Sequence, residues 1–177
     1  DGSLHNFTPE RSIEIQKNLG ADIILAFDEC TSPLSGYEYT KKAMERTHKW
    51  AKESLYYYKK SLKTKKNKKY GPQSLYGIVQ GGAYKDLRIK SAKFISSLNF
   101  DGIAIGGSLG KSKEDMHKIL DWVIPLLSES KPRHLLGIGE IGDLFECVEK
   151  GIDTFDCVMP TRLVRRGALY LSPSSGG

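Results

Sequence analysis

The side chains best placed for chemistry are two aspartates, Asp28 and Asp156, each of which directly follows a phenylalanine at the end of a short apolar run. An ionised carboxylate can accept two N–H hydrogen bonds from the edge of a guanine-like base. It can also attack a sugar carbon and form a covalent glycosyl ester, which divides one difficult step into two easier ones. Each aspartate alone could equally be a helix N-cap, so the neighbouring residues must decide.

Polar or glycine residues follow the other apolar runs as well. They are Gln80-Gly81-Gly82, Gly106-Gly107 and Gly137. The Gln80 amide can donate to a carbonyl oxygen, and glycine at position 107 lets a backbone N–H approach a ligand closely. Asp28, Gln80 and Gly107 together therefore match the hydrogen-bonding edge of guanine. Two alternatives stay open, because Gln80 could bond loop backbone and Gly106-Gly107 could cradle a phosphate.

The elements that would position these residues alternate along the chain. Short apolar runs are expected to be strands buried on both faces, and the long amphipathic runs between them are expected to be helices. The expected strands cover 22–27, 75–79, 102–105, 134–136 and 152–155. The expected helices run from Pro9, with Thr8 as N-cap, to a stop at Gly20, then over 39–62, over 84–98, from Ser112 onwards and over 143–150.

Strands that alternate with helices form a parallel sheet with right-handed crossovers. We therefore expect an α/β fold, an incomplete (β/α)8 TIM barrel with about five of its eight units, because a whole barrel takes about 250 residues. A flavodoxin-like open sheet also fits the number of strands. Residues 1–177 are expected to be part of one barrel domain, excised from a longer sequence that supplies the other strands.

Helical spacing also assigns side chains to the core. In the first helix these are Ile13, Gln16 and Leu19. On the inner face of the 39–62 helix they are Ala43, Thr47, Trp50, Ala51, Leu55, Tyr58 and Leu62. In the helix that begins at Ser112 they are Met116, Ile119, Leu120, Val123, Leu126 and Leu127.

The composition is that of a globular protein with excess positive charge. The 177 residues carry a formal net charge of +6, and no apolar run reaches the ~20 residues of a membrane span. The three cysteines, Cys30, Cys147 and Cys157, have no C-x-x-C spacing. This pattern argues against a disulfide framework or a complete zinc site and favours the reducing cytoplasm.

Two basic clusters could bind a polyanion by neutralising its phosphates. One is the lysine-rich run 59–69, whose simpler interpretation is a solvated helix end followed by a linker. The other contains Arg162, Arg165 and Arg166 and lies a few residues after Asp156.

Longer motifs, in order along the whole chain, give these residues a context. They are Thr8-Pro9-Glu10-Arg11-Ser12-Ile13-Glu14-Ile15-Gln16, Phe27-Asp28-Glu29-Cys30, Gly77-Ile78-Val79-Gln80-Gly81-Gly82, Ile105-Gly106-Gly107 and Phe155-Asp156-Cys157-Val158-Met159-Pro160-Thr161-Arg162. With them the chain resembles the tRNA-guanine transglycosylase (queuine tRNA-ribosyltransferase) family. The length of the motifs argues against an unrelated barrel enzyme that binds a phosphorylated metabolite.

The resemblance implies an activity and a role for each motif residue. Asp156 resembles the nucleophile that attacks the ribose C1′ of the wobble guanosine in tRNA, after which a 7-deazaguanine base replaces the guanine. Asp28 resembles the carboxylate that binds the guanine edge, with Gln80 and the Gly107 backbone on the carbonyl oxygen. The pocket walls would be Cys30 and Leu136, the latter standing where the family commonly has methionine.

The resemblance also implies partners. Arg162 and Arg165, with Arg166 beside them, resemble residues that grip the anticodon loop, whose target base must leave its stack. The expected partners are tRNA, a 7-deazaguanine base and a second copy of the full-length protein. The alternative is a non-catalytic tRNA-binding paralogue subunit, which the presence of Asp156 disfavours.

Three departures qualify the resemblance. The family's acid/base aspartate belongs to a region before Asp1, and its Zn²⁺ ligands belong to a region after Gly177, so we expect no metal ligand within this chain. Lys111 falls about where bacterial members have a glutamate that helps a loop adapt to an aminomethyl group. A lysine would repel such an ammonium group, which leaves the identity of the incoming base open.

Overall fold

The structure, a computed structural model, describes residues 2–62 and 73–170. Helices and strands alternate, as the sequence predicted. The helices are α1 (Pro9–Leu19), α2 (Tyr37–Leu62), α3 (Lys85–Ser96), α4 (Lys113–Val123), α5 (Ile141–Glu149) and α6 (Met159–Arg165), and a 3-10 turn, η2 (Ile124–Leu126), follows α4. The strands are β1 (Ile23–Leu25), β2 (Ser74–Val79), β3 (Gly102–Ile105), β4 (Arg133–Leu135) and β5 (Thr154–Phe155).

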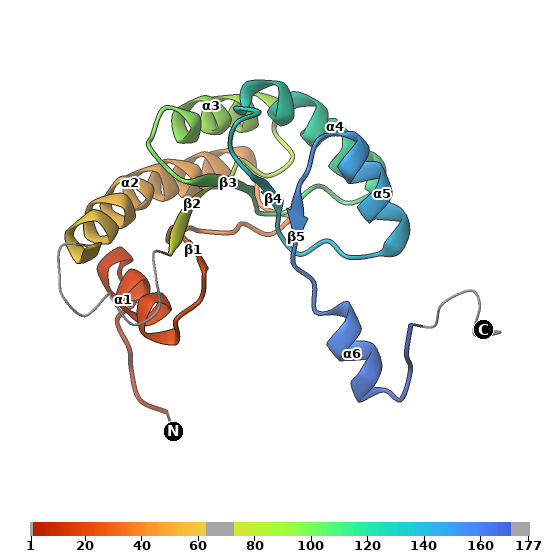
Figure 1. The fold of residues 1–177 in the computed structure, drawn as a ribbon. Coiled ribbons are helices and arrows are strands. Elements are labelled where there is room, and N and C mark those ends of the chain that lie inside the picture. Colours follow the sequence, from red (N-terminus) through yellow and green to blue (C-terminus); the bar gives the residue numbers. More distant parts are fainter. Residues whose placement is uncertain (1, 63–72, 171–177) are drawn as a thin grey trace.

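The strands form one five-stranded parallel sheet in the order β1-β2-β3-β4-β5. In a flavodoxin-like sheet the second strand lies outside the first, so that alternative is wrong. Figure 1 shows α1 to α5 as an arc around the outside of the curved sheet. Sequential parallel strands with helices on one side make the wall of a β/α barrel, which confirms the expected incomplete TIM barrel.

The first helix is fixed to the first strand by its caps and by one polar side chain. Thr8 Oγ1 accepts a hydrogen bond from the backbone N–H of Arg11 at 3.2 Å, and the helix stops at Gly20, as expected. Gln16 bonds both the backbone carbonyl and the N–H of Leu25 in β1, each at 2.8 Å. This helix therefore holds the strand whose loop carries Asp28.

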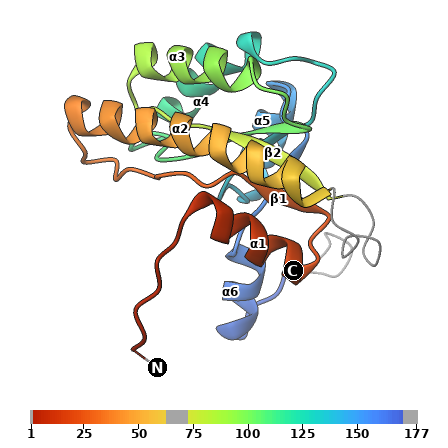
Figure 2. The ribbon, with the colours of Figure 1, turned by 90° about the vertical axis from the view of Figure 1, so that its left-hand side faces the viewer.

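The core lies between the sheet and the outer helices. Figure 2 shows the long α2 with α1 on one side of it and α3 on the other, and α2 contacts both. Strands β2 and β3 are almost wholly buried, as the apolar runs predicted. The largest fully buried apolar side chains are Phe100, Ile13, Ile24, Met44, Leu75, Ile95, Ile103, Ile105, Ile119, Leu120 and Leu135.

The ends of two helices depart from the predicted core. Leu19 and Leu62 are 78% and 47% exposed, because each is the last residue of its helix and extends past the packed face. Strand β1 also ends earlier than expected, at Leu25, although the N–H of Ala26 still bonds the carbonyl of Tyr76 at 2.9 Å.

Helix α6 was not predicted from the sequence. It has seven residues, none of them buried, with Pro160 in its first turn. Figure 1 shows it extending away from the sheet below β5. With only seven residues, the helix is too short to show a convincing apolar period in the sequence.

Candidate active site

Asp28 is the more buried of the two predicted site carboxylates and lies in the loop after β1. Gln80, directly after β2, donates from Nε2 to Asp28 Oδ2 at 2.6 Å. The two residues meet because β1 and β2 are parallel neighbours whose carboxyl ends lie side by side. Burial raises the pKa of Asp28, and the hydrogen bond from Gln80 opposes that shift.

Buried polar side chains hold Gln80 from the outer side of the sheet. Its backbone N–H donates to Ser91 Oγ in α3 at 3.0 Å, and Ser91 Oγ lies 3.1 Å from Nε2 of His48 in α2. The His48 ring stacks on Phe94 with a centroid distance of 4.1 Å. Burial lowers the pKa of His48 to about 4. The ring is therefore neutral near pH 7 and can accept the hydrogen of the Ser91 hydroxyl.

Gly107 lies against the Gln80 amide. Its φ is +78°, and a Cβ at this position would lie 2.1 Å from Gln80 Oε1. Any other residue would therefore strain the backbone and displace Gln80. Among the described residues Gln80 Oε1 is buried and lacks a hydrogen-bond donor. Such acceptors are uncommon in folded proteins, which marks this point as a place for a ligand or water donor.

The loops after β2 and β3 are joined by Arg88, a fully buried side chain of α3. Its Nε donates to the carbonyl of Gly82 at 2.6 Å, and its Nη1 donates to those of Val79 at 3.2 Å and Gly106 at 2.7 Å. Its Nη2 donates to the carbonyl of Ser108 at 2.8 Å. Burial lowers the pKa of Arg88 to about 10, so the side chain stays charged at neutral pH. One cation thus fixes both sides of Gly107.

The loop that carries Asp28 is fixed by hydroxyl groups of α2. Ser54 Oγ accepts from the backbone N–H of Phe27 at 3.1 Å, and Thr47 Oγ1 accepts from that of Glu29 at 3.0 Å. The N–H groups on both sides of Asp28 are therefore bound. Thr47 was predicted on the inner face of this helix, and from there its hydroxyl bonds the backbone of the loop.

Asp156, directly after β5, has an exposed side chain with 58% of its area accessible. Its Oδ1 accepts from the backbone N–H of Gly137 at 3.0 Å and lies 3.2 Å from Nε2 of His134 in β4. Gly137 has a φ of +76°, which only glycine adopts readily, and this turn brings its N–H to the carboxylate.

Neither aspartate is the N-cap of the next helix. Helix α2 begins at Tyr37, well beyond Asp28, and the N-cap of α6 is Val158 rather than Asp156. The N-cap interpretation of the two residues is therefore wrong, and each carboxylate is available for another role.

A cavity of about 820 Å³ opens at the loops after β1, β3 and β4, and its lining residues do not include Asp28, Gln80 or Asp156. It is lined by Cys30, Gly107 and Leu136, three of the residues predicted to bind a base, and also by Lys111. Desolvation and the nearby Asp28 carboxylate raise the pKa of the Cys30 thiol. The thiol is therefore protonated at neutral pH, which suits a wall residue and not a thiolate nucleophile.

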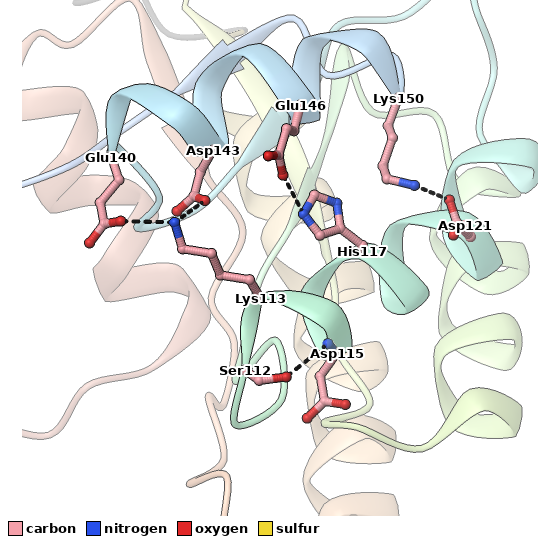
Figure 3. Close-up of polar contacts among 9 residues, drawn as sticks. All are labelled: Ser112, Lys113, Asp115, His117, Asp121, Glu140, Asp143, Glu146 and Lys150. Carbon is pink, nitrogen blue, oxygen red and sulfur yellow. Dashed lines mark hydrogen bonds and ion pairs between the residues drawn. The ribbon is translucent and has the colours of Figure 1, made fainter.

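Ion pairs between α4 and α5 support the loop that follows β4 (Figure 3). Lys113 Nζ lies 3.0 Å from Glu140 Oε2 and 2.8 Å from Asp143 Oδ1, and these two carboxylates raise the pKa of Lys113. Further along, His117 Nε2 lies 2.7 Å from Glu146 Oε2. Lys150 pairs with Asp121 at 2.5 Å. Helix α4 itself begins at its predicted N-cap, Ser112, which accepts from the N–H of Asp115 at 3.3 Å.

The predicted RNA-binding arginines lie apart from the cavity, on α6 and just beyond it. Arg162, Arg165 and Arg166 are all exposed, and their spacing of three and four residues puts them on one side of the helix. None of them forms an ion pair with another residue of the ranges 2–62 and 73–170. Of the predicted lysine-rich run, Lys59 and Lys60 lie in the last turn of α2, and residues 63–69 lie outside the described ranges.

Within the described part of the chain, no group of three or more His, Cys, Asp or Glu side chains could hold a metal ion. The resemblance places the Zn²⁺ ligands after Gly177, so Zn²⁺ stays an expectation, and no chemical step below uses a metal. No described helix is both long and apolar enough to cross a membrane.

Supporting residues that the sequence did not predict are Ser91, Arg88, Ser54, His48 and His134. Ser54, Arg88 and Ser91 are polar residues on the buried faces of α2 and α3, and a polar residue in an apolar stripe was an available signal. His134 was left without a role, because only the register of β4 with β5 places it beside Asp156.

Comparison with known proteins identifies the family of this chain. The family model described as "Queuine tRNA-ribosyltransferase" matches residues 1–176. A relative from Archaeoglobus fulgidus, named "Putative queuine tRNA-ribosyltransferase", is 60% identical over 99% of this chain and 41% of its own length. Queuine tRNA-ribosyltransferases of Roseiflexus sp. and Herpetosiphon aurantiacus are 52% and 51% identical, over 94% and 97% of this chain and 42% and 41% of their own. The chain spans about two fifths of the length of these relatives, and it belongs to the queuine tRNA-ribosyltransferase family.

Proposed function

We propose that the protein containing this chain is a tRNA-guanine transglycosylase, which replaces the wobble guanine of a tRNA by a 7-deazaguanine base. The proposal rests on two aspartates that follow the carboxyl ends of β1 and β5 and lie in opposite environments. Asp28 is desolvated and bound by Gln80, whereas Asp156 is exposed and bound through one oxygen. Two carboxylates in different surroundings are suited to two different tasks.

Asp156 is proposed as the nucleophile. A carboxylate oxygen of Asp156 would form a bond to ribose C1′ while the bond from C1′ to N9 of guanine breaks. The electron pair of that bond leaves with the guanine, which takes up a proton. In the second half the incoming base loses its N9 proton and attacks C1′, and the aspartyl ester bond breaks. The residue that moves these protons is expected outside this chain, in the region before Asp1.

Asp28, Gln80 and Gly107 are proposed to read the base. An ionised Asp28 can accept the N1–H and the 2-amino hydrogen of guanine. Gln80 Nε2 carries two hydrogens, of which one is given to Asp28, so the second can be donated to the base carbonyl. Arg88 and the α2 hydroxyls keep these groups in place before the base arrives, which is the preorganisation that base recognition needs.

The exposed cluster Arg162, Arg165 and Arg166 is proposed to bind the anticodon loop, because arginine pairs well with phosphates and stacks on unpaired bases. Lys111, on the cavity wall, would oppose a cationic substituent on the incoming base and favours a neutral one. Zn²⁺ and a second copy of the full-length protein remain expectations from the family resemblance.

The test is base exchange by the full-length protein with radiolabelled guanine and a tRNA that has a wobble guanosine. We expect Asp156→Asn to abolish incorporation of label, because an amide is a very poor nucleophile. Asp22→Asn, an exposed aspartate directly before β1, is the matched control and should exchange at the wild-type rate.

The alternative, a non-catalytic RNA-binding subunit, gives a different result in the same assay. The full-length wild-type protein would then bind the tRNA without exchanging the label. Exchange by Asp156→Asn at a rate near that of the wild type would overturn the assignment of the nucleophile.

A further inference from the structure

The carboxylate of Asp156 is held on one side only. Both of its contacts, the N–H of Gly137 at 3.0 Å and Nε2 of His134 at 3.2 Å, go to Oδ1. Among the described residues no contact is formed with Oδ2. The two oxygens of this carboxylate are therefore different, and one of them stays open.

The sheet places His134 in this position. His134 in β4 is the register partner of Thr154 in β5, so their side chains share one face of the sheet. Asp156 is two residues beyond Thr154 and projects to the same face. The His134 imidazole, only 15% exposed, bridges the two: Nδ1 lies 2.9 Å from Thr154 Oγ1, and Nε2 faces Asp156.

The chemistry of the two partners determines which nitrogen of the His134 ring carries the hydrogen. An ionised carboxylate has no hydrogen to give, so Nε2 must carry one to bond Asp156 Oδ1. In the neutral ring Nδ1 is then an acceptor, and the Thr154 hydroxyl is a suitable donor to it. The Asp156 carboxylate thus sets the tautomer, and the Thr154 hydroxyl, which can donate to Nδ1, holds the ring in the orientation that faces Asp156.

We infer that His134 is a positioning residue for the nucleophile: with Gly137 it fixes Oδ1 of Asp156 and leaves Oδ2 to attack the ribose. The inference rests on the proposed function and adds to it a residue and a choice of oxygen. Attack requires an oxygen lone pair to be aligned with C1′ within a small distance, and a carboxylate free to rotate loses part of the rate that alignment provides.

The test uses variants of the full-length protein in the guanine-exchange assay. His134→Phe keeps a ring and removes the donor, and we expect it to lower kcat about tenfold or more. KM for guanine and Kd for the tRNA should stay within about twofold, because no substrate-binding group is altered. His134→Gln can place an amide N–H near the position of Nε2 and should recover a large part of the lost kcat.

Thr154→Val gives an independent measurement. It removes the hydroxyl that bonds Nδ1 of His134 and keeps the side-chain shape. We expect a smaller fall in kcat than for His134→Phe, and no further fall when Thr154→Val is added to His134→Phe, since Thr154 acts through the ring. The rate at which the covalent enzyme–RNA complex forms in a single turnover should fall in parallel with kcat.

The outcomes separate this inference from the proposed function. If the wild type exchanges guanine and Asp156→Asn does not, the proposed function stands and the His134 variants test the inference alone. A wild-type kcat for His134→Phe would overturn it. So would equal losses in His134→Phe and His134→Gln, or a change confined to KM or Kd. If His134→Phe does not fold, the comparison of Thr154→Val with Thr154→Ser decides, because only valine should slow kcat.

Discussion

Asp28 and Asp156 are the same amino acid at the carboxyl ends of β1 and β5, and their neighbours give them different properties. Asp28 is enclosed by Gln80 and the surrounding loops, and burial raises its pKa. Asp156 is exposed to solvent, with backbone and imidazole donors on one oxygen. At the scale of single residues, we propose that Asp28 recognises the base and that Asp156 attacks the ribose.

The raised pKa of Asp28 predicts a conflict between stability and function. A carboxyl group whose pKa is higher in the folded state favours folding when it is protonated, and that contribution is lost as the pH rises through the folded pKa. At pH 7 the ionised Asp28 therefore destabilises the protein. We expect Asp28→Asn to leave the melting temperature unchanged or raised at pH 7, measured by calorimetry on the full-length protein.

The same variant should lose base recognition. Hydrogen bonds to a charged group contribute about 1.5–3 kcal/mol, so kcat/KM for guanine should fall at least about tenfold, with tRNA binding nearly unchanged. In the wild type, lowering the pH protonates Asp28 and should raise KM for the base. Because the pKa of Asp28 is raised, this increase in KM should begin at a higher pH than it would for an ordinary aspartate. Asp22→Asn, exposed at the other end of β1, is the control and should change neither quantity.

At the scale of elements, the site is fixed by the outer helices acting through the sheet. Helix α2 bonds the loop of Asp28, α3 supplies Ser91 and Arg88, and α4 is joined to α5 by ion pairs. The loops after β2, β3 and β4 are rich in glycine, and the loop of Asp28 has no regular secondary structure, so all of them depend on these contacts for their shape. Substitutions in the helices should therefore reach the site without touching a substrate.

Arg88 gives the clearest case. Arg88→Met would leave the carbonyls of Val79, Gly82, Gly106 and Ser108 without their buried donor, and losing several such bonds costs on the order of 3 kcal/mol. We expect a matching fall in the free energy of unfolding, measured by urea denaturation, and a higher KM for guanine because Gly107 is released. Arg88→Lys retains the charge and some of the hydrogen bonds, so its losses should be smaller. Equal stability of all three proteins would contradict the role of Arg88.

The sequence predicted the positions of most strands and helices, but not the contacts that hold these elements together. Apolar runs and caps such as Thr8 and Ser112 located the strands and helix starts, because burial and capping are local properties of the chain. The order of strands, which excludes the flavodoxin-like sheet, is not local. The contacts of His134 and Arg88 depend on register and on packing between elements, and α6 is too short to give a convincing periodic signal.

At the scale of the whole molecule, the described residues form an open wall. Strands β1 and β5 each pair with one neighbour among the described strands, which leaves two sheet edges. Large apolar side chains of α5 and α6 are exposed, including Phe145 at 71% and Val164 at 58%. Open edges and grouped apolar side chains favour association.

We therefore expect residues 1–177, expressed alone, to associate or to melt without cooperativity. Light scattering after size-exclusion chromatography and thermal unfolding would measure both properties. Phe145→Ser should reduce the association, whereas Tyr56→Ser, an exposed residue of α2 at 62%, should not. A monodisperse monomer with a cooperative transition would contradict this expectation.

Under the proposed function, Asp156 bonds covalently to the ribose of the target guanosine. The most direct measurement mixes the full-length protein with an anticodon stem-loop RNA, quenches in denaturant, and maps the RNA-linked peptide by mass spectrometry. We expect a nucleoside adduct on Asp156 that is absent from the Asp156→Asn variant. The adduct should also disappear when excess guanine is added before the quench. An adduct on another carboxylate, or guanine exchange by Asp156→Asn, would contradict it.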